Sequence, residues 1–448
     1  MDADPSGMTP LVSFASLALV LVLQNVVTLS VNLADNLMLG GYAETALSGV
    51  AAVNQVQFIY QQLLMALGDG VVIFCARYWG ARDLEPMRRI SSLAMRLAIG
   101  ISLVLFALVS LFPRQVLLVF TDDEAIIAEG VRYLSIVRFS YCFFAVTQIV
   151  LATLRSIEVV RISFFLSILA LVVNCCINYT LIYGRFGFPE MGVEGAAIGT
   201  LSCRIVELVV LLVFVRFRKL ALRLRPSDYV MVDHRLAGSY FRLTGPLVFN
   251  AALWGLNTAM QTVILGHMTA AAIAANSASS TLYLLVKSTA VGSASAASVI
   301  IGKAIGEGDR GRVMRISRQL QVAFLAIGIA SGLFLFAVSR PVMSLYHLSP
   351  EAMGLMRKFL LVLPVTFVGM SYEMPNNAVL KAGGCTKSVV KMNLVSIWAI
   401  VIPLSLFMAF VVHASPVVVV ICLNSDQVFK CLPSWYLVNK TEWIRSLS

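Results

Sequence analysis

Apolar stretches of about twenty residues recur along the whole of this 448-residue chain, and they constrain its fold more than any motif does. As a helix, each stretch is long enough to cross a hydrocarbon core of about 30 Å. Only 13% of the residues are charged, whereas soluble domains average about 25%. The sequence therefore predicts an all-α polytopic membrane protein. Its twelve predicted transmembrane helices are residues 11–40, 52–76, 92–112, 131–154, 161–183, 194–215, 241–265, 276–301, 318–339, 355–380, 388–413 and 415–437.

Basic side chains gather in alternate loops of this predicted topology. The rich loops lie at residues 77–89, 155–161, 216–235, 303–318 and 381–387. Loops rich in Lys and Arg stay in the cytoplasm, so an even number of spans puts both termini there. The net charge of +11 then faces anionic lipid, and no nucleic-acid partner is expected.

An internal repeat predicts how the spans are organised. Residues 38–83 align without a gap with residues 264–309, at an offset of 226 (264 minus 38). The same offset relates residues 152–161 to 378–387. Two halves of six spans that start on the same side are related by an axis along the membrane normal, as in parallel-repeat transporters.

The predicted lobes are residues 1–215 and 241–448, joined by a basic cytoplasmic linker at 216–240. We expect them to form a parallel pseudo-two-fold pair with a cleft between them. Alternating access is the transport mechanism that such a geometry favours.

Polar side chains inside the predicted spans are functional candidates, because an Asp at a helix centre costs about 2.5–3.5 kcal/mol on insertion. Asp35 lies in the first span, and Asn32 lies one turn earlier on the same face. Asn174 and Asn178 share a face of the fifth span, and Thr200 lies in the sixth. Simpler interpretations stay open: a wetted Asp35 at the outer mouth, interhelical packing bonds from the asparagines, and a Thr200 bonded to its own helix backbone.

Several motifs are similar to those of the multidrug and toxic compound extrusion (MATE) family. They are DNLMLGGYAETALSGVAAVNQ, ARYWGARD, LVVNCCINYTLIYGRFGFPEMGVEGAAIGT, ANSASSTLYLLVKSTAVGSASAASVIIGKAIGEGD and VLKAGGCTK. They keep the order of the family and cover nearly the whole chain. The resemblance implies a bacterial-type efflux transporter of twelve helices, which exchanges organic cations or amphipathic drugs for inward-moving H+ or Na+.

In that family, an aspartate on helix 1 and polar residues on helices 5 and 6 form an ion site. The resemblance maps Asp35, Asn174, Asn178 and Thr200 onto this cation-coupling site, although some relatives carry an acid where this chain has Asn178. The site suits either ion, because desolvation favours a protonated carboxyl group and hard oxygen ligands hold cations. No cofactor other than the coupling ion is expected.

The C-terminal half departs from the family pattern. Many relatives have an acid on helix 7, where this chain has Ala251 or Trp254 depending on the subfamily, and another early in helix 11, where it has Asn393. We therefore expect coupling to depend on Asp35.

Three charged residues lie well inside spans of this half: Lys287, Glu373 and Asp426. Intramembrane charges usually pair, so a neutralising network is one interpretation. Binding of a cationic substrate by Glu373 or Asp426 is the other.

A substrate cleft for amphipathic cations needs aromatic faces and adaptable apolar side chains. The predicted cleft residues are Asn32, Tyr60, Gln61, Met65, Asn250, Trp254, Met260, Tyr283, Glu373 and Asp426. The partners expected are small organic cations or amphipathic drugs and the lipid bilayer, and we expect a monomer.

Three other classes of protein compete with an exporter as interpretations of this sequence. An enzyme needs a reactive pair, but the four histidines fall at or beyond span ends, the cysteines have no metal-binding spacing, and no phosphate-binding loop is present. A flippase for a lipid-linked oligosaccharide precursor is the alternative; it should place basic residues in the cleft to meet a diphosphate. A third interpretation is a binding or sensory membrane protein that has lost transport.

Overall fold

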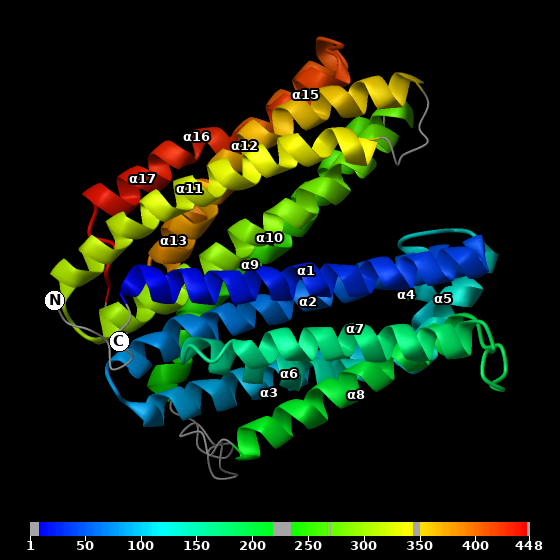
Figure 1. Cartoon of the computed structure of the whole chain (residues 1–448), viewed down its shortest axis with the longest axis horizontal. Coiled ribbons are helices and arrows are strands. Elements are labelled where there is room, and N and C mark those ends of the chain that lie inside the picture. The colour runs from blue at the N-terminus through cyan, green and yellow to red at the C-terminus, as the bar shows by residue number, and fades with distance from the viewer. Residues whose placement is uncertain (1–8, 218–233, 267, 269, 344–349, 446–448) are drawn as a thin grey trace. The chain divides into compact units, whose positions relative to one another are not determined.

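The computed structural model describes residues 9–217, 234–266, 268, 270–343 and 350–445, and every regular element in these ranges is helical (Figure 1). The elements of the first half are α1 (Pro10–Tyr42), α2 (Glu44–Gly80), α3 (Leu84–Leu111), α4 (Pro113–Leu118), α5 (Glu124–Val137), α6 (Ser140–Ser156), α7 (Arg161–Ile182) and α8 (Val193–Phe217). Those of the second half are α9 (His234–Gly266), α10 (Ala270–Gly306), α11 (Arg310–Met343), α12 (Pro350–Ala382), α13 (Thr386–Asn393), the π-helix η2 (Leu394–Val401), α14 (Ile402–Leu406), the π-helix η3 (Phe407–Val411), α15 (Pro416–Asn424), α16 (Asp426–Phe429) and α17 (Cys431–Lys440).

These helices account for the predicted spans. Within the described ranges, ten helical segments are long and apolar enough to cross a membrane, and the pair α5 and α6, bent by 58°, adds an eleventh if it counts as one span. The 33-residue helix α9 covers the predicted span 241–265. The predicted polytopic helical fold is therefore confirmed, with a bend in the fourth span that the sequence did not reveal.

The internal repeat reappears in the helix boundaries. Both α2 and α10 contain 37 residues, and each boundary of α10 lies 226 residues after that of α2 (270 minus 44, 306 minus 80). The turns that follow also correspond, because Arg82 and Gly308 both have a left-handed backbone, with φ of 57° and 88°. The next residue caps the following helix in both cases: Asp83 accepts a hydrogen bond from Glu85 N, and Asp309 accepts one from Arg312 N.

The chain divides into two compact units. The Asp35 unit is Leu23–Phe241, and the Glu373 unit is Met1–Val22 together with Arg242–Ser448. The first part of α1 thus groups with the C-terminal helices. The predicted lobes 1–215 and 241–448 stay a prediction, and most of the predicted linker 216–240 lies outside the described residues.

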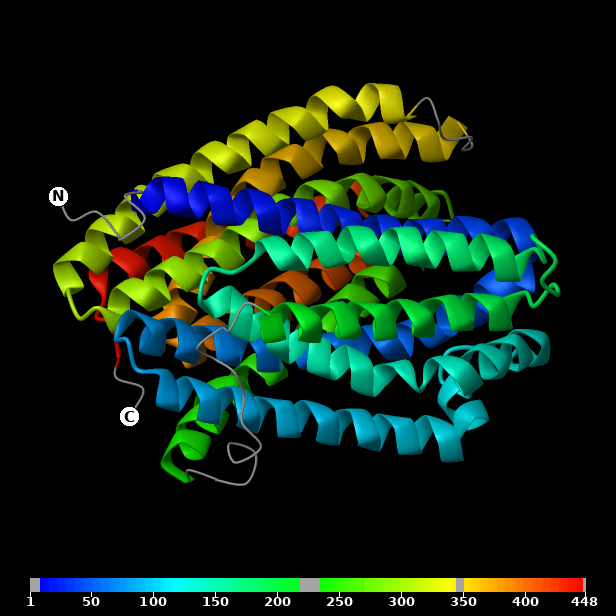
Figure 2. The same cartoon turned by 60° about the horizontal axis from the view of Figure 1, so that its bottom comes forward.

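Glycines allow close helix packing inside each unit. In the Asp35 unit, α7 and α8 lie side by side (Figure 1, Figure 2), and a Cβ at Gly195 would come 2.7 Å from the carbonyl carbon of Leu181. In the Glu373 unit, a Cβ at Gly369 of α12 would come 2.4 Å from the carbonyl oxygen of Gln427 in α16. These contacts place the polar side chains described next.

Candidate functional site

The first polar cluster joins α1 to α7 in the Asp35 unit. Asn178 Nδ2 donates a hydrogen bond to Asp35 Oδ1 at 2.6 Å and another to Asn174 Oδ1 at 3.3 Å. Both asparagines are buried, and Asp35 is half-buried. Their spacing of four residues puts Asn174 and Asn178 on one face of α7. The structure thus brings three of the four predicted coupling residues together.

The side-chain amide of Asn178 packs against Gly199 of α8, where there is no room for a Cβ. A Cβ at Gly199 would come 2.0 Å from Asn178 Oδ1, so the amide oxygen lies directly against the α8 backbone. This buried oxygen accepts no hydrogen bond from the described residues. An unpartnered acceptor beside a carboxylate suits a proton donor or a hard cation.

Thr200, the fourth predicted coupling residue, has a different described partner. Its Oγ1 lies 3.3 Å from the hydroxyl of Tyr133 in α5, a buried side chain that the sequence did not single out. The Thr200 hydroxyl therefore contacts α5, and among the described residues no hydrogen bond joins it to Asp35.

One ion pair inside the sixth span was missed by the sequence analysis. Arg204 Nη1 lies 2.8 Å from Glu207 Oε2, and the Arg204 guanidinium lies over the Phe144 ring, 4.8 Å from its centroid. Both charges are visible within the apolar run 194–215, so the rule that intramembrane charges mark functional or paired positions would have found them. Arg204 lies one turn beyond Thr200 on α8.

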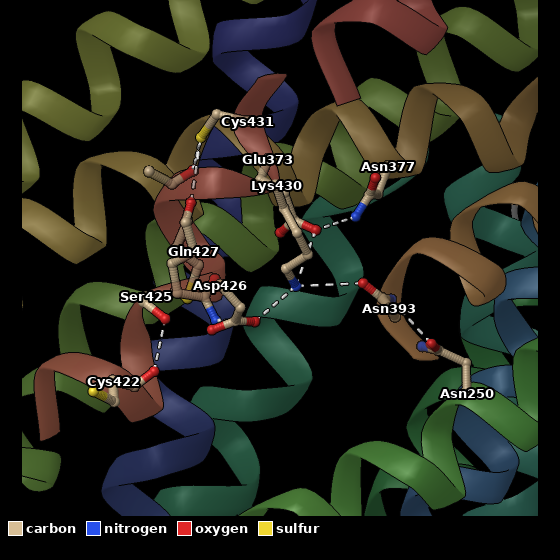
Figure 3. A network of polar contacts seen from close by, with 12 residues as sticks. Asn250, Glu373, Asn377, Asn393, Cys422, Ser425, Asp426, Gln427, Lys430 and Cys431 are labelled. Atoms are coloured by element: carbon tan, nitrogen blue, oxygen red, sulfur yellow. Dashed lines mark hydrogen bonds and ion pairs between the residues drawn. The ribbon is translucent and has the colours of Figure 1, made fainter. Parts of the chain in front are cut away.

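The second polar cluster lies in the Glu373 unit and centres on Lys430 (Figure 3). Lys430 Nζ lies 2.9 Å from Asp426 Oδ2 and 3.3 Å from Glu373 Oε1. All three side chains are at most 6% exposed. Asn377, one turn beyond Glu373 on α12, donates a further hydrogen bond to Glu373 Oε1. We term these residues the Lys430 cluster.

Two asparagines extend the Lys430 cluster toward a less buried position. Lys430 Nζ donates to Asn393 Oδ1 at 3.3 Å, and Asn393 Nδ2 donates to Asn250 Oδ1 at 3.0 Å. Asn250 of α9 is half-buried. Asn393, noted in the sequence as a missing acid, therefore contributes a neutral oxygen next to a lysine.

The helices are irregular where they contribute to the Lys430 cluster. Glu373 lies two residues before Pro375 in α12, and Asn393 is the last residue before the π-helix η2. Asp426 and Lys430 lie at the two ends of the four-residue helix α16. Broken helices and π-helical turns inside spans are typical of binding sites in transport proteins.

Lys287, expected to neutralise Glu373 and Asp426, lies elsewhere. Its Nζ is 4.2 Å from the centroid of the Trp254 ring. The network that was expected around the two carboxylates is thus formed with Lys430, and Lys287 makes a cation–π contact instead.

The other predicted cleft residues of the Glu373 unit pack against its core. The Tyr283 hydroxyl donates to Met370 Sδ at 3.3 Å, and its ring meets Phe367 edge-on, with centroids 5.9 Å apart. Met260 is partly buried against the same core.

The predicted cleft residues of the Asp35 unit differ in exposure. Tyr60 is buried; its hydroxyl donates to the Tyr141 carbonyl at 2.8 Å and lies 2.6 Å from Ser102 Oγ. Gln61 is half-buried, while Asn32 and Met65 are exposed. Tyr60 therefore makes its hydrogen bonds inside the Asp35 unit. The exposed side chains of Asn32 and Met65 are more available for ligand contact.

Repeated membrane-spanning helices with polar clusters inside them define a polytopic membrane transporter. The sequence model of the MatE family matches residues 21–180 and 246–407, so it covers both halves of the repeat, and the chain belongs to this family. Its members transport and are not enzymes, which confirms the expected class.

Similar proteins agree with this assignment. The chain is 26% identical over 397 residues to the probable multidrug resistance protein NorM of Thermotoga maritima, covering 88% of this chain and 84% of that protein. It is 22% identical over 402 residues to the multidrug resistance protein MdtK of Pectobacterium atrosepticum, covering 87% and 85%.

Solved structures share the fold. A crystal structure of MATE in complex with MaL6 matches with a TM-score of 0.86 and 16% identity, over 96% of this chain and 97% of that one. A MOP superfamily transporter from Pyrococcus furiosus matches with a TM-score of 0.86 and 17% identity, over 98% and 100%.

Proposed function

We propose that this protein is a secondary active exporter of cationic or amphipathic organic compounds, driven by inward exchange of H+ or Na+ through alternating access. The observation that carries the proposal is Asp35, a carboxylate inside a membrane helix that is held by a buried amide. The names of the relatives NorM and MdtK support multidrug export.

Asp35, Asn174 and Asn178, termed the Asp35 cluster, supply a physical basis for coupling. The bond from Asn178 Nδ2 to an ionised Asp35 is charge-assisted, and such bonds are about twice as strong as neutral ones. When a proton or sodium ion neutralises Asp35, this bond weakens and α1 is freer to shift against α7. Coupling requires that ion and drug prefer different states of the protein.

Localisation follows from the same proposal. The basic loops favour a topology with both termini in the cytoplasm, and we propose that the chain works as a monomer in the bacterial inner membrane. The lipid-linked flippase is disfavoured because Arg204 and Lys430, two basic residues inside spans, are each bound to carboxylates, which leaves Lys287, over the Trp254 ring, as the one basic residue discussed above that could meet a diphosphate.

Uptake of a fluorescent organic cation into proteoliposomes tests the proposal. Wild type should accumulate the cation under an imposed proton gradient or sodium gradient, and the effective gradient names the ion. Asp35→Asn should lose the gradient-driven part, whereas the exposed Asp122→Asn should retain it. Full transport by Asp35→Asn, or no transport by wild type under either gradient, would contradict the proposal.

A further inference from the structure

The Lys430 ammonium is bound as a ligand ammonium would be. An ammonium group has three N–H donors, and Nζ meets three oxygens: Asp426 Oδ2 at 2.9 Å, Glu373 Oε1 at 3.3 Å and Asn393 Oδ1 at 3.3 Å. These oxygens come from three elements, α16, α12 and α13. The Lys430 cluster is therefore an ammonium-binding site that is filled by a side chain of the protein itself (Figure 3).

The two carboxylates hold Lys430 unequally. Asp426 lies four residues earlier, on the same turn, at the shorter distance. Glu373 comes from another helix at the longer distance. Rotation of the lysine side chain can release Glu373 while the contact with Asp426 is kept, because residues at i and i+4 are neighbours on one helix face.

The surroundings of Glu373 contain a spare acceptor. Asn377 donates its Nδ2 to Glu373, and its buried Oδ1 accepts no hydrogen bond from the described residues. Asn377 is 6% exposed. Glu373 Oε1 and Asn393 Oδ1 converge on one point, because each lies 3.3 Å from Lys430 Nζ, and an incoming N–H donor group would meet both acceptors there.

We propose that Glu373, Asn377 and Asn393 form a recognition site for organic cations that carry N–H bonds, namely primary ammonium or guanidinium groups, and that Lys430 is a tethered competitor for this site. The inference rests on the proposed export of cations and names their chemical class. Tyr283 contacts α12 at Phe367 and Met370, and its partly buried ring can meet the apolar body of such a ligand.

A lysine that competes with the ligand lowers the free-energy cost of ligand release. A buried carboxylate left without a partner is strongly destabilising. When the ligand leaves, Lys430 returns to Glu373, so the carboxylate is compensated in both states. A quaternary ammonium has no N–H bond and leaves the acceptors on Glu373 and Asn393 unsatisfied, which costs affinity.

Binding of a matched pair of ligands, hexylammonium and hexyltrimethylammonium, tests this inference on the purified full-length protein without any gradient. Wild type should bind hexylammonium about tenfold more tightly, the effect of one charge-assisted hydrogen bond. Lys430→Met removes the competitor and should tighten hexylammonium by about tenfold more. The exposed Lys391→Met should change neither ligand.

Two further variants keep the test decisive if Lys430→Met does not fold. Asn377→Leu, which removes the hydrogen bond that orients Glu373, should weaken the preference for hexylammonium, and the uncharged triple variant Glu373→Gln, Asp426→Asn and Lys430→Met should lose it. Equal binding of the two ligands by wild type, or a preference that persists in the triple variant, would overturn the inference. Because no gradient is applied, a wild type that shows this preference but moves no cation would contradict the proposed function alone.

Discussion

The Asp35 cluster and the Lys430 cluster show how two related halves can handle a buried carboxylate differently. Asp35 lies on an unbroken helix and is bound by a neutral amide. Glu373 and Asp426 lie beside helix irregularities and are bound by a lysine. The structure thus shows no ion pair for Asp35 among the described residues, whereas Glu373 and Asp426 share the ammonium group of Lys430.

Both halves also place a basic residue on their last span. Arg204 and Lys430 are separated by the repeat offset of 226 (430 minus 204). Arg204 pairs within its own helix with Glu207, while Lys430 reaches across to Glu373 on α12. Arg204 is thus paired with Glu207, and Asp35 is bound by Asn178. The two basic residues at corresponding positions of the repeat therefore have different partners.

The largest effect on stability is expected when the charge of Lys430 is removed. Lys430→Met leaves Glu373 and Asp426 buried without their cation, and loss of one partner of a buried pair costs about 3–5 kcal/mol. The thermal unfolding midpoint in detergent should fall accordingly. The double variant with Glu373→Gln should recover part of the loss, and a midpoint unchanged in Lys430→Met would show that the ion pair is not structural.

Gly369→Ala should have the next largest effect. Its Cβ would come 2.4 Å from the Gln427 carbonyl oxygen, so α12 and α16 must separate, at a cost of about 1–3 kcal/mol. The same unfolding measurement serves, with Gly354→Ala as the matched control because nothing lies within 4 Å of its added Cβ. Equal unfolding midpoints for Gly369→Ala and Gly354→Ala would mean that α16 can move away from α12 at little cost.

Gly199→Ala tests the corresponding contact in the Asp35 unit. The added Cβ meets the end of the Asn178 side chain, not backbone, so the amide can turn away and the stability loss should be only about 1 kcal/mol. Gradient-driven transport should fall markedly because Asp35 loses its bond. Gly100→Ala, which meets nothing within 4 Å, should transport as wild type does; a fully active Gly199→Ala would remove Asn178 from the mechanism.

Thr200→Val should have the smallest effect. It removes the hydroxyl contact with Tyr133, and a typical hydrogen bond contributes about 0.5–1.5 kcal/mol to stability. Unfolding should shift slightly, and gradient-driven transport should be retained. If transport is lost as completely as in Asp35→Asn, Thr200 is a direct coupling residue and the Asp35 cluster extends onto α8.

The sequence was sufficient for the fold and for part of the first cluster. The offset of 226 predicted the correspondence of α2 with α10. The spacing of Asn174 and Asn178 predicted their shared face, because helical periodicity acts over a few residues. Their contact with Asp35 was anticipated through the family resemblance.

In the Lys430 cluster, the spacing of four residues between Asp426 and Lys430 is a local signal of the same kind, but the pairing of Lys430 with Glu373 could not be derived in this way. Lys430 lies 57 residues beyond Glu373 (430 minus 373), and their pairing depends on the close approach of α12 and α16 at Gly369. Such a contact is tertiary and leaves no periodic signal. Lys287, which lies 86 residues before Glu373 (373 minus 287), was the partner expected from the sequence, but the structure places it against Trp254.

Ion flux driven by substrate tests the central claim, that Asp35 and not the Lys430 cluster couples ion to drug. Proteoliposomes that contain a proton-sensitive or a sodium-sensitive dye would be given a quaternary organic cation, and the flux of each ion would be recorded. Flux of one ion is expected in wild type and in Glu373→Gln, and no flux is expected in Asp35→Asn. Undiminished flux in Asp35→Asn, or loss of flux in Glu373→Gln, would contradict the central claim.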